Sequence, residues 1–416
     1  MRLLQMLCVV LMVLCSTVQS KEHSHSHATG NNNRNDRASG SQKMYEENTD
    51  FAFRLYKHIS ALPGFQSKNI FFSPLSVSVA LSALSLGARG KTHQQLFEGL
   101  GFNATDITAE EVSQSFQSII ENLNNKTDVD LSLGNVLFID ETFKLRPEFL
   151  ESMKRYYHSD GFSVDFTKTE EAKEQINKYV EEKTKGKIKK MVEGLDPVTG
   201  MYLINYIYFK GEWENPFDEF DTKTDIFHVD NDTKVPVRMM NIDDDHHVYY
   251  DEDISTHVLQ LRYKGSVSML LVLPEKGLQS LGEVLRRDRL NKWIHSLQER
   301  YYDVYVPKLS METSYQLKEV LSGMGITDMF QDTADLSGVS EKGNLFVSQG
   351  IHKTTLDVSE DGTFASAATG FRIVPLSGWL GPTPILKFNR PFMIFVIDCE
   401  TISILFMGKI ENPGKQ

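Results

Sequence analysis

The residue types that most often bind metals gather at two places in the chain. Residues 243–247 read DDDHH, and His23, His25 and His27 alternate with serine near the N-terminus. Adjacent residues of an extended loop point apart, so the first group is expected to be a solvated acidic turn. The histidine array has the composition for weak Zn²⁺ or Cu²⁺ binding, but a solvated tail is the favoured interpretation. We therefore expect no metal site.

The motifs of the common catalytic classes are missing from the sequence. It contains no G-x-S-x-G nucleophile elbow, no H-E-x-x-H zinc motif, no P-loop and no paired-cysteine metal motif. We therefore expect a protein that is not an enzyme and needs no cofactor. One predicted helix has the basic residues to bind a sulfated glycan, although a solvated helix face is the favoured interpretation; its basic residues are Arg286, Arg287, Arg289 and Lys292.

The segment DGTFASAATGFRIVPLSGW, residues 361–379, is nearly free of charge and rich in small side chains. Within it, Thr363–Phe371 has the small, uncharged residues without proline that suit a segment entering between two paired strands. Twelve such residues would span roughly 40 Å at ~3.3 Å each. The alternatives are an alanine-rich helix or a flexible loop. Gly362, Gly370 and the threonines argue against a stable helix, and without its flanking sequence the segment would be interpreted as a linker.

Hydrophobic periodicity predicts the elements that must position this segment. Ser73-Pro74 is typical of a helix start and opens a buried helix over 75–86. Other helices are expected over 51–62 and 169–186, and strands over 130–139, 267–273, 303–307, 392–397 and 402–407. No internal repeat or long linker interrupts residues 48–416, so one mixed α+β domain is expected there.

The N-terminus predicts secretion. Residues 1–20 have a basic start, an apolar run and a small-x-small cleavage site, as in a signal peptide. Residues 21–47 are polar and are expected to be disordered. No later run reaches 18 apolar residues, so a membrane-bound mature protein is not expected. The net charge of −12, without a long lysine or arginine block, argues against nucleic-acid binding.

Further features fit an extracellular chain. Sequons at Asn103, Asn125 and Asn231 predict surface positions, of which we expect two to be glycosylated. Cys399 is the single cysteine after the signal peptide, so no internal disulfide is expected. It could be capped or pair with another chain, but an unreacted small residue near a hairpin turn is favoured.

Several blocks resemble the serpin family in the family's own order. They are NIFFSPLSVSVALSALSLGARGKTHQQL (69–96), INKYVEEKTKGKI (176–188), LINYIYFKGEWENPF (203–217), ADLSGVS (334–340), IHKTTLDVSEDGT (351–363) and FNRPFMIFVID…ILFMGKIENP at the end. The resemblance runs from about Asn48 to Pro413 and is strongest to the secreted α1-antitrypsin-like (clade A) group. It implies an α+β serpin fold with three β-sheets, about nine helices and an exposed reactive-centre loop at about 361–384.

The resemblance implies a monomeric suicide inhibitor of an extracellular serine protease. The protease cleaves the loop and stays covalently attached while the loop inserts into the central sheet. Counting seventeen residues from Glu360 places the reactive bond at Leu376–Ser377, whereas counting back from residues 387–389 favours Leu380–Gly381. The forward count is preferred because the inserted length fixes how tightly the protease is pressed against the inhibitor. Leucine predicts chymotrypsin-like, cathepsin-G-like or elastase-like targets, while a trypsin-like enzyme would have to choose Arg372.

Other residues carry over from the family by motif. The hinge of the loop would be Gly362, Thr363, Phe364, Ala365, Ser366, Ala367 and Ala368. Phe364 departs from the glutamate that inhibitory serpins usually carry, and by alternation it should face outward after insertion. A polar cluster that gates insertion (the shutter) would be Ser73, Ser76, Asn205 and His352, and Trp213 would lie where the loop enters (the breach). Core packing or helix capping is the plainer alternative for each.

Two further interpretations follow from the resemblance. Glycosaminoglycan activation through the helix after Glu110 is not expected, because residues 111–124 contain no lysine or arginine. The alternative function is a non-inhibitory serpin that carries a small hydrophobic hormone, since such carriers can keep a permissive hinge.

Overall fold

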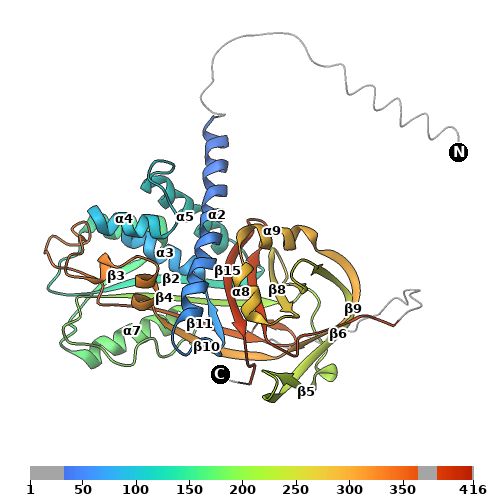
Figure 1. Ribbon diagram of the computed structural model, residues 1–416. Coiled ribbons are helices and arrows are strands. Elements are labelled where there is room, and N and C mark those ends of the chain that lie inside the picture. The colour runs from blue at the N-terminus through green and yellow to red at the C-terminus, as the bar shows by residue number, and fades with distance from the viewer. Residues whose placement is uncertain (1–31, 364–381, 415–416) are drawn as a thin grey trace, which may run out of the picture. The chain divides into compact units, whose positions relative to one another are not determined.

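The computed structural model describes residues 32–363 and 382–414 (Figure 1). These ranges contain nine α-helices and fifteen strands. The chain divides into two compact units, Met1–Ser39 and Gly40–Gln416. Of the first unit only residues 32–39 are described, and they are helical.

Helix α2 (Asn32–Ala61) begins well before the predicted start of order near residue 48. The predicted disordered extension is therefore too long, and of it only residues 21–31, with the signal peptide, lie outside the described chain. From residue 43 onward these extra turns are held by packing that polarity alone does not indicate. Met44 is 0% exposed, and Glu46 forms an ion pair with Arg287 at 2.8 Å. Thr49 is a helix-interior residue whose hydroxyl donates to the Tyr45 carbonyl.

The six-stranded sheet holds the predicted insertion site. Its strands follow the order β10 (Leu309–Gln316), β11 (Gln349–Val358), β4 (Met201–Glu212), β2 (Val129–Asp140) and β3 (Asp160–Val164), with β12 (Gly362–Thr363) also paired to β4. The parallel ladder between β11 and β4 runs from Gln349↔Tyr202 to Thr354↔Ile207. Beyond that pair, β4 continues to Glu212 and takes β12 as its antiparallel neighbour. The two central strands thus part at one end. The segment 361–379, called the bait segment below, begins between them.

The remaining strands form one nine-stranded sheet, so the described strands make two hydrogen-bonded sheets instead of the predicted three. The physical reason is β6 (Lys234–Asp251), whose eighteen residues pair with β5 at one end, β7 at the other and β9 along the middle. The other members are β1 (Ile70–Phe72), β5 (Lys223–His228), β7 (Thr256–Arg262), β8 (Val267–Pro274), β9 (Gln298–Pro307), β13 (Ile385–Lys387), β14 (Phe392–Asp398) and β15 (Ser403–Ile410).

Helix α3 (Pro74–Ser85) lies between the two sheets and contacts β15 of one and β2 and β4 of the other. All twelve of its residues are buried, as its apolar and small side chains require. Ser73 caps it by accepting a hydrogen bond from the Ser76 amide, which confirms the predicted start. The outer face of the six-stranded sheet is covered by α7 (Thr169–Lys183), whose Ala172, Ile176 and Val180 form a second apolar cluster with strand residues (Figure 1).

The other helices complete the described chain. They are α4 (Gly90–Gly99), α5 (Ala109–Asn124), α6 (Pro147–Tyr157), α8 (Leu278–Val284), α9 (Arg287–Ser296) and α10 (Leu317–Gly323), with short 3₁₀ turns η1 (Glu219–Asp221) and η2 (Asp328–Phe330). The predicted strands near 130–139, 267–273 and 303–307 and the final hairpin are confirmed. Among the described residues, no helix is both long and apolar enough to cross a bilayer.

The early start of α2 makes a first prediction. Met44→Ala should lower the free energy of unfolding by roughly 2–5 kcal/mol, because it leaves a cavity in the core. Guanidinium unfolding followed by circular dichroism measures this, with exposed Lys57→Ala on the same helix as the control. A Met44→Ala change as small as that of the control would mean that the helix does not pack here.

Candidate functional site

The bait segment starts with a tight turn at the end of β11. Ser359 and Gly362 face each other across it: the Ser359 amide donates to the Gly362 carbonyl at 2.8 Å, and the Gly362 amide donates back at 3.2 Å. The chain thereby reverses and runs antiparallel to β4, with Gly362 opposite Glu212 and Thr363 opposite Gly211. Gly362 has φ +141°, and a Cβ there would lie 2.1 Å from the Gly211 carbonyl oxygen. Only glycine fits this position.

Thr363 is already inside the sheet. Its side chain is 1% exposed, and its hydroxyl is 2.8 Å from the hydroxyl of Tyr263. The Tyr263 ring stacks on Trp213 with centroids 4.3 Å apart. The Trp213 indole N–H donates to the Ser359 carbonyl at 2.9 Å, and the Trp213 amide donates to Asp361. Burial raises the pKa of Tyr263, so its hydroxyl stays protonated and available to Thr363. Trp213 therefore lies directly against the turn that precedes Thr363, and its role as the entry point stays a prediction.

Glu360 anchors the same turn. Its carboxylate accepts hydrogen bonds from the Thr222 hydroxyl at 2.8 Å and from Lys308 at 2.6 Å. Its carbonyl accepts from the Phe217 amide. Burial raises the pKa of Glu360, but the hydrogen bonds from Lys308 and Thr222 outweigh it and hold the pKa below its usual value. Glu360 is thus ionised and fixed, and the first residues of the bait segment start from a rigid base.

The four predicted shutter residues meet beneath the paired part of β4 and β11. Asn205 of β4 lies opposite His352 of β11 in the ladder, and the His352 Nδ1 and the Asn205 side-chain oxygen form a hydrogen bond. The Asn205 amide donates to the Ser76 carbonyl at 2.8 Å and to its hydroxyl. The Ser73 amide donates to His352 Nε2 at 3.0 Å. The cluster therefore ties both central strands to helix α3.

Histidine 352 is held neutral in this cluster. Its Nε2 must accept from Ser73, so Nδ1 carries the proton that it donates to Asn205. The side chain is 1% exposed. This burial lowers the pKa of His352 to about 3.

Some residues of the site were not found from the sequence. Tyr263, Lys308 and Thr222 are far from the bait segment in the chain and belong to no motif that singles them out. Asn135 of β2 also joins the shutter through a hydrogen bond from Asn205, its partner in the ladder. A polar residue inside an otherwise apolar strand was the available signal for Asn135.

Several predicted site residues lie outside the described chain. They are Phe364, Ala365, Ser366, Ala367, Ala368, Leu376 and Ser377. The three sequons are exposed at Asn103, Asn125 and Asn231, as predicted for surface positions. Cys399 is a free, exposed thiol that directly follows β14.

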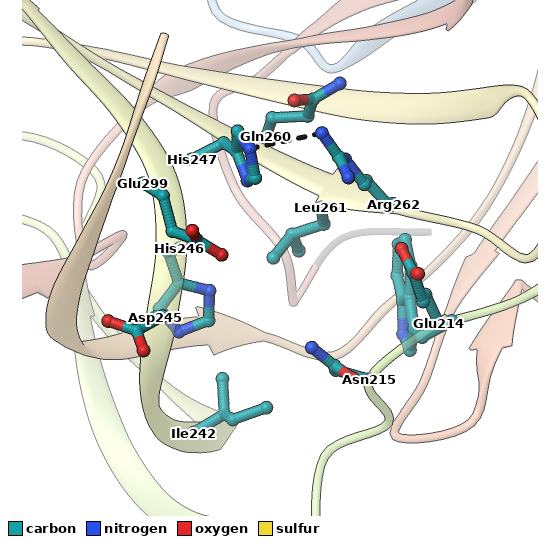
Figure 2. A pocket seen from close by; sticks show the side chains of 11 residues that line it. Glu214, Asn215, Ile242, Asp245, His246, His247, Gln260, Leu261, Arg262 and Glu299 are labelled. Atoms are coloured by element: carbon teal, nitrogen blue, oxygen red, sulfur yellow. Dashed lines mark hydrogen bonds between the residues drawn. The ribbon is translucent and has the colours of Figure 1, made fainter. Parts of the chain in front are cut away.

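The acidic segment 243–247 is strand, not the predicted solvated turn. It lies within β6 and pairs with β9 from Asp243↔Asp303 to His247↔Glu299, because a long-range ladder satisfies its backbone. With Trp213, Glu214, Arg262 and other residues it lines a pocket of about 140 Å³ (Figure 2). His247 Nε2 is 3.1 Å from the Arg262 guanidinium. Within the described ranges, no cluster of three or more histidine, cysteine or acidic side chains is placed to hold a metal.

The basic residues of α9 are largely ion-paired, which corrects the expectation of a solvated face. Arg287 contacts Glu46 and Asp50, and Arg289 lies 2.7 Å from the buried Asp251. Lys292 also pairs with Asp251. Carboxylates brought from α2 and β6 thus occupy the charges that a sulfated glycan would need.

A family model and several known proteins are similar to this chain over most of its length. The family model described as Serpin (serine protease inhibitor) matches residues 46–413. Alpha-1-antiproteinase 2 of Equus caballus is 41% identical over 412 residues, covering 98% of this chain and 96% of the relative. Alpha-1-antichymotrypsin of Pongo abelii is 41% identical over 373 residues, covering 88% and 87%. Human thyroxine-binding globulin, solved with its hormone, is similar with TM-score 0.84 and 38% identity, covering 90% of this chain and all of the other.

The fit of Gly362 makes a second prediction. Gly362→Ala should expel Thr363 from the sheet, because the new methyl group collides with the Gly211 carbonyl. Trp213 then loses its bonds to the turn, and the tryptophan emission and near-ultraviolet circular dichroism should change. Gly343→Ala is the control, since no atom lies within 4 Å of a Cβ at that position. Identical spectra for Gly362→Ala and wild type would contradict the seated hinge.

The neutral His352 predicts how stability depends on pH. Between pH 6.5 and about 3 the unfolded histidine binds a proton that the folded one does not. The free energy of unfolding should therefore fall on acidification, by up to ~1.4 kcal/mol per pH unit from this group. His352→Gln should flatten the slope of unfolding free energy against pH over this range. Parallel slopes for the two proteins would show that His352 is not the titrating group.

Proposed function

The chain belongs to the serpin family, and on this premise we propose that it is a secreted suicide inhibitor of an extracellular serine protease. Relatives named antiproteinase and antichymotrypsin support protease inhibition in general. The observation that carries the proposal for this chain is the position of Thr363. It is buried and paired with β4 where β4 and β11 part, so Gly362 and Thr363 together already form the start of an additional strand.

The proposed reaction starts at the Leu376–Ser377 bond. The protease serine attacks the Leu376 carbonyl, the peptide bond breaks, and Ser377 leaves as a new amino terminus. Leu376 remains esterified to the protease. The freed segment then continues from Thr363 along β4, gaining backbone hydrogen bonds worth on the order of 0.5–1.5 kcal/mol each. Its small, uncharged residues suit a central strand position, and the attached protease is drawn along the sheet before water hydrolyses the ester.

In this mechanism the shutter residues oppose the separation of β4 and β11. Insertion requires β4 and β11 to separate beyond their present ladder, and His352 and Asn205 are bonded to each other across that ladder. Both also bond to the start of helix α3, which is buried between the two sheets. We infer that this network holds the sheet closed until the cleaved segment competes for β4.

The target class follows from the residue before the proposed cut. Leu376 fits an apolar primary pocket, so chymotrypsin-like or elastase-like serine proteases are the proposed partners. The inhibitor is proposed to act extracellularly as a glycosylated monomer, given its signal-like residues 1–20 and its three exposed sequons. Phe364 is proposed to face away from α3 after insertion, since Thr363 faces inward and strand residues alternate.

A hormone carrier is the second candidate. It is favoured by the likeness to thyroxine-binding globulin, which was solved with a bound hormone. Against it, the pocket beside Trp213 has a volume of about 140 Å³, below the ~300–1,000 Å³ usual for small-molecule sites. A larger pocket of about 470 Å³ beside α6 is within that range, but Arg89, Arg146 and Glu148 are part of its lining. Its charged lining also suits a hydrophobic hormone poorly. Inhibition is therefore the better-supported function.

The decisive experiment mixes the purified protein with chymotrypsin or neutrophil elastase and resolves the products on denaturing gels. Wild type should form an adduct that survives denaturation. Thr363→Arg should be cleaved without an adduct, because a buried, unpaired guanidinium makes insertion unfavourable. Thr363→Ser keeps the hydroxyl and serves as the matched control. Clean cleavage of wild type by every protease of the panel would reject the inhibitor and favour the carrier.

A further inference from the structure

One aromatic side chain is exposed beside the hinge. Phe220 is 90% exposed, the most of any large apolar side chain among the described residues. It sits at the centre of the short turn η1, between Trp213 at the end of β4 and the start of β5. A single exposed phenylalanine is ordinary on a protein surface, so its significance depends on the turn that holds the ring and on the charges around it.

The turn that carries Phe220 is rigid. The Phe220 amide donates to the Asp218 carboxylate at 2.9 Å, and the Thr222 amide donates to the Glu219 carbonyl at 3.2 Å. Arg238 donates to the Thr222 carbonyl at 3.0 Å. A flexible loop would let the ring fold back onto the protein. Here the backbone holds it outward, so little conformational entropy is lost when a partner covers it.

The same turn is bonded directly to the bait segment. On one side of Phe220, the Phe217 amide donates to the Glu360 carbonyl. On the other side, the Thr222 hydroxyl donates to the Glu360 carboxylate. Glu360 lies three residues before Thr363, where the described part of the segment ends. The exposed ring therefore lies on a turn that is fixed to the base of this segment.

Carboxylates surround the exposed ring. Asp218, Glu219 and Asp221 are all exposed, and within the described ranges no lysine or arginine forms an ion pair with any of them. The negative field extends to the hinge: burial, and then the charge of Glu219, raises the pKa of Asp361. A partner that covers the turn must therefore bring positive charge to its rim.

We propose that Phe220 and its flanking carboxylates Asp218, Glu219 and Asp221 form an exosite for the target protease. The partner it fits is a serine protease with an apolar notch, bordered by lysine or arginine, on the surface beside its active-site cleft. This inference rests on the proposed inhibitory function and adds a second contact outside the bait segment. The acidic rim steers a basic protease toward the bait, and the ring then anchors it.

The experiment measures the second-order rate constant of adduct formation with chymotrypsin-like and elastase-like proteases that range from acidic to basic. Phe220→Ser should lower the constant roughly tenfold or more for the basic enzymes, as for a truncated hot spot. Asp218→Asn/Glu219→Gln/Asp221→Asn should flatten the dependence of the constant on salt. The number of inhibitor molecules used per protease should stay unchanged in both variants.

Val198→Ser is the matched control. Val198 is 83% exposed but precedes the opposite end of β4, which at ~3.3 Å per residue lies roughly 36 Å from Glu212. It should leave the rate constant unchanged. Equal rate constants for wild type and Phe220→Ser with every protease that forms an adduct would overturn the exosite. So would a Phe220-dependent dimer in sedimentation, because the ring would then serve a second copy of this chain.

A parallel measurement separates this inference from the proposed function. Proteases whose active-site serine is replaced by alanine cannot form the ester, but they still dock. Their equilibrium affinity for wild type should exceed that for Phe220→Ser roughly tenfold. That result without any covalent adduct from active enzyme would reject inhibition and keep the docking surface. Adducts without any Phe220 effect on affinity would reject the surface alone.

Discussion

The structure depends on the parallel ladder between β4 and β11, which ends at Thr354↔Ile207 while β4 runs on for five more residues. Two central strands normally pair along their whole length, since an unpaired backbone group in a buried sheet is costly. Here the last residues of β4 take their partner from β12 instead. This incomplete pairing leaves a place where the proposed insertion would begin, and the residues around it either fill that place or bond the two strands together.

Two groups of contacts lie on opposite sides of the point where β4 and β11 part. Below it, His352, Asn205 and the cap of α3 bind the strands to each other and to a helix that both sheets bury. Above it, Glu360 fixes the reversing turn, and the Trp213–Tyr263 stack closes over Thr363. The pocket beside Trp213 is small and polar, so this point is held by direct contacts more than by any molecule that could fill a cavity.

Local signals predicted much of this, and long-range ones did not. Ser73-Pro74, the apolar strands and the terminal hairpin were legible because each depends on neighbours in sequence. The start of α2 at Asn32 was missed because burial of Met44 depends on the rest of the core. Residues 243–247 were taken for a turn because their polarity hides a ladder to residues 299–303. Serpin resemblance supplied Trp213 and the shutter, whereas Tyr263 and Asn135 needed the three-dimensional partners that define them.

The seated pair Gly362↔Glu212 also determines how any further strand growth must proceed. A new strand between two others must pair in the right register, because a slip of one residue would turn every side chain to the wrong face. With two pairs formed, Gly362↔Glu212 and Thr363↔Gly211, and a glycine that no other residue can replace, the start of the strand exists beforehand and its register is fixed. The new strand can then lengthen residue by residue from this fixed start. Its rate depends on how fast β4 and β11 separate and not on finding the correct register.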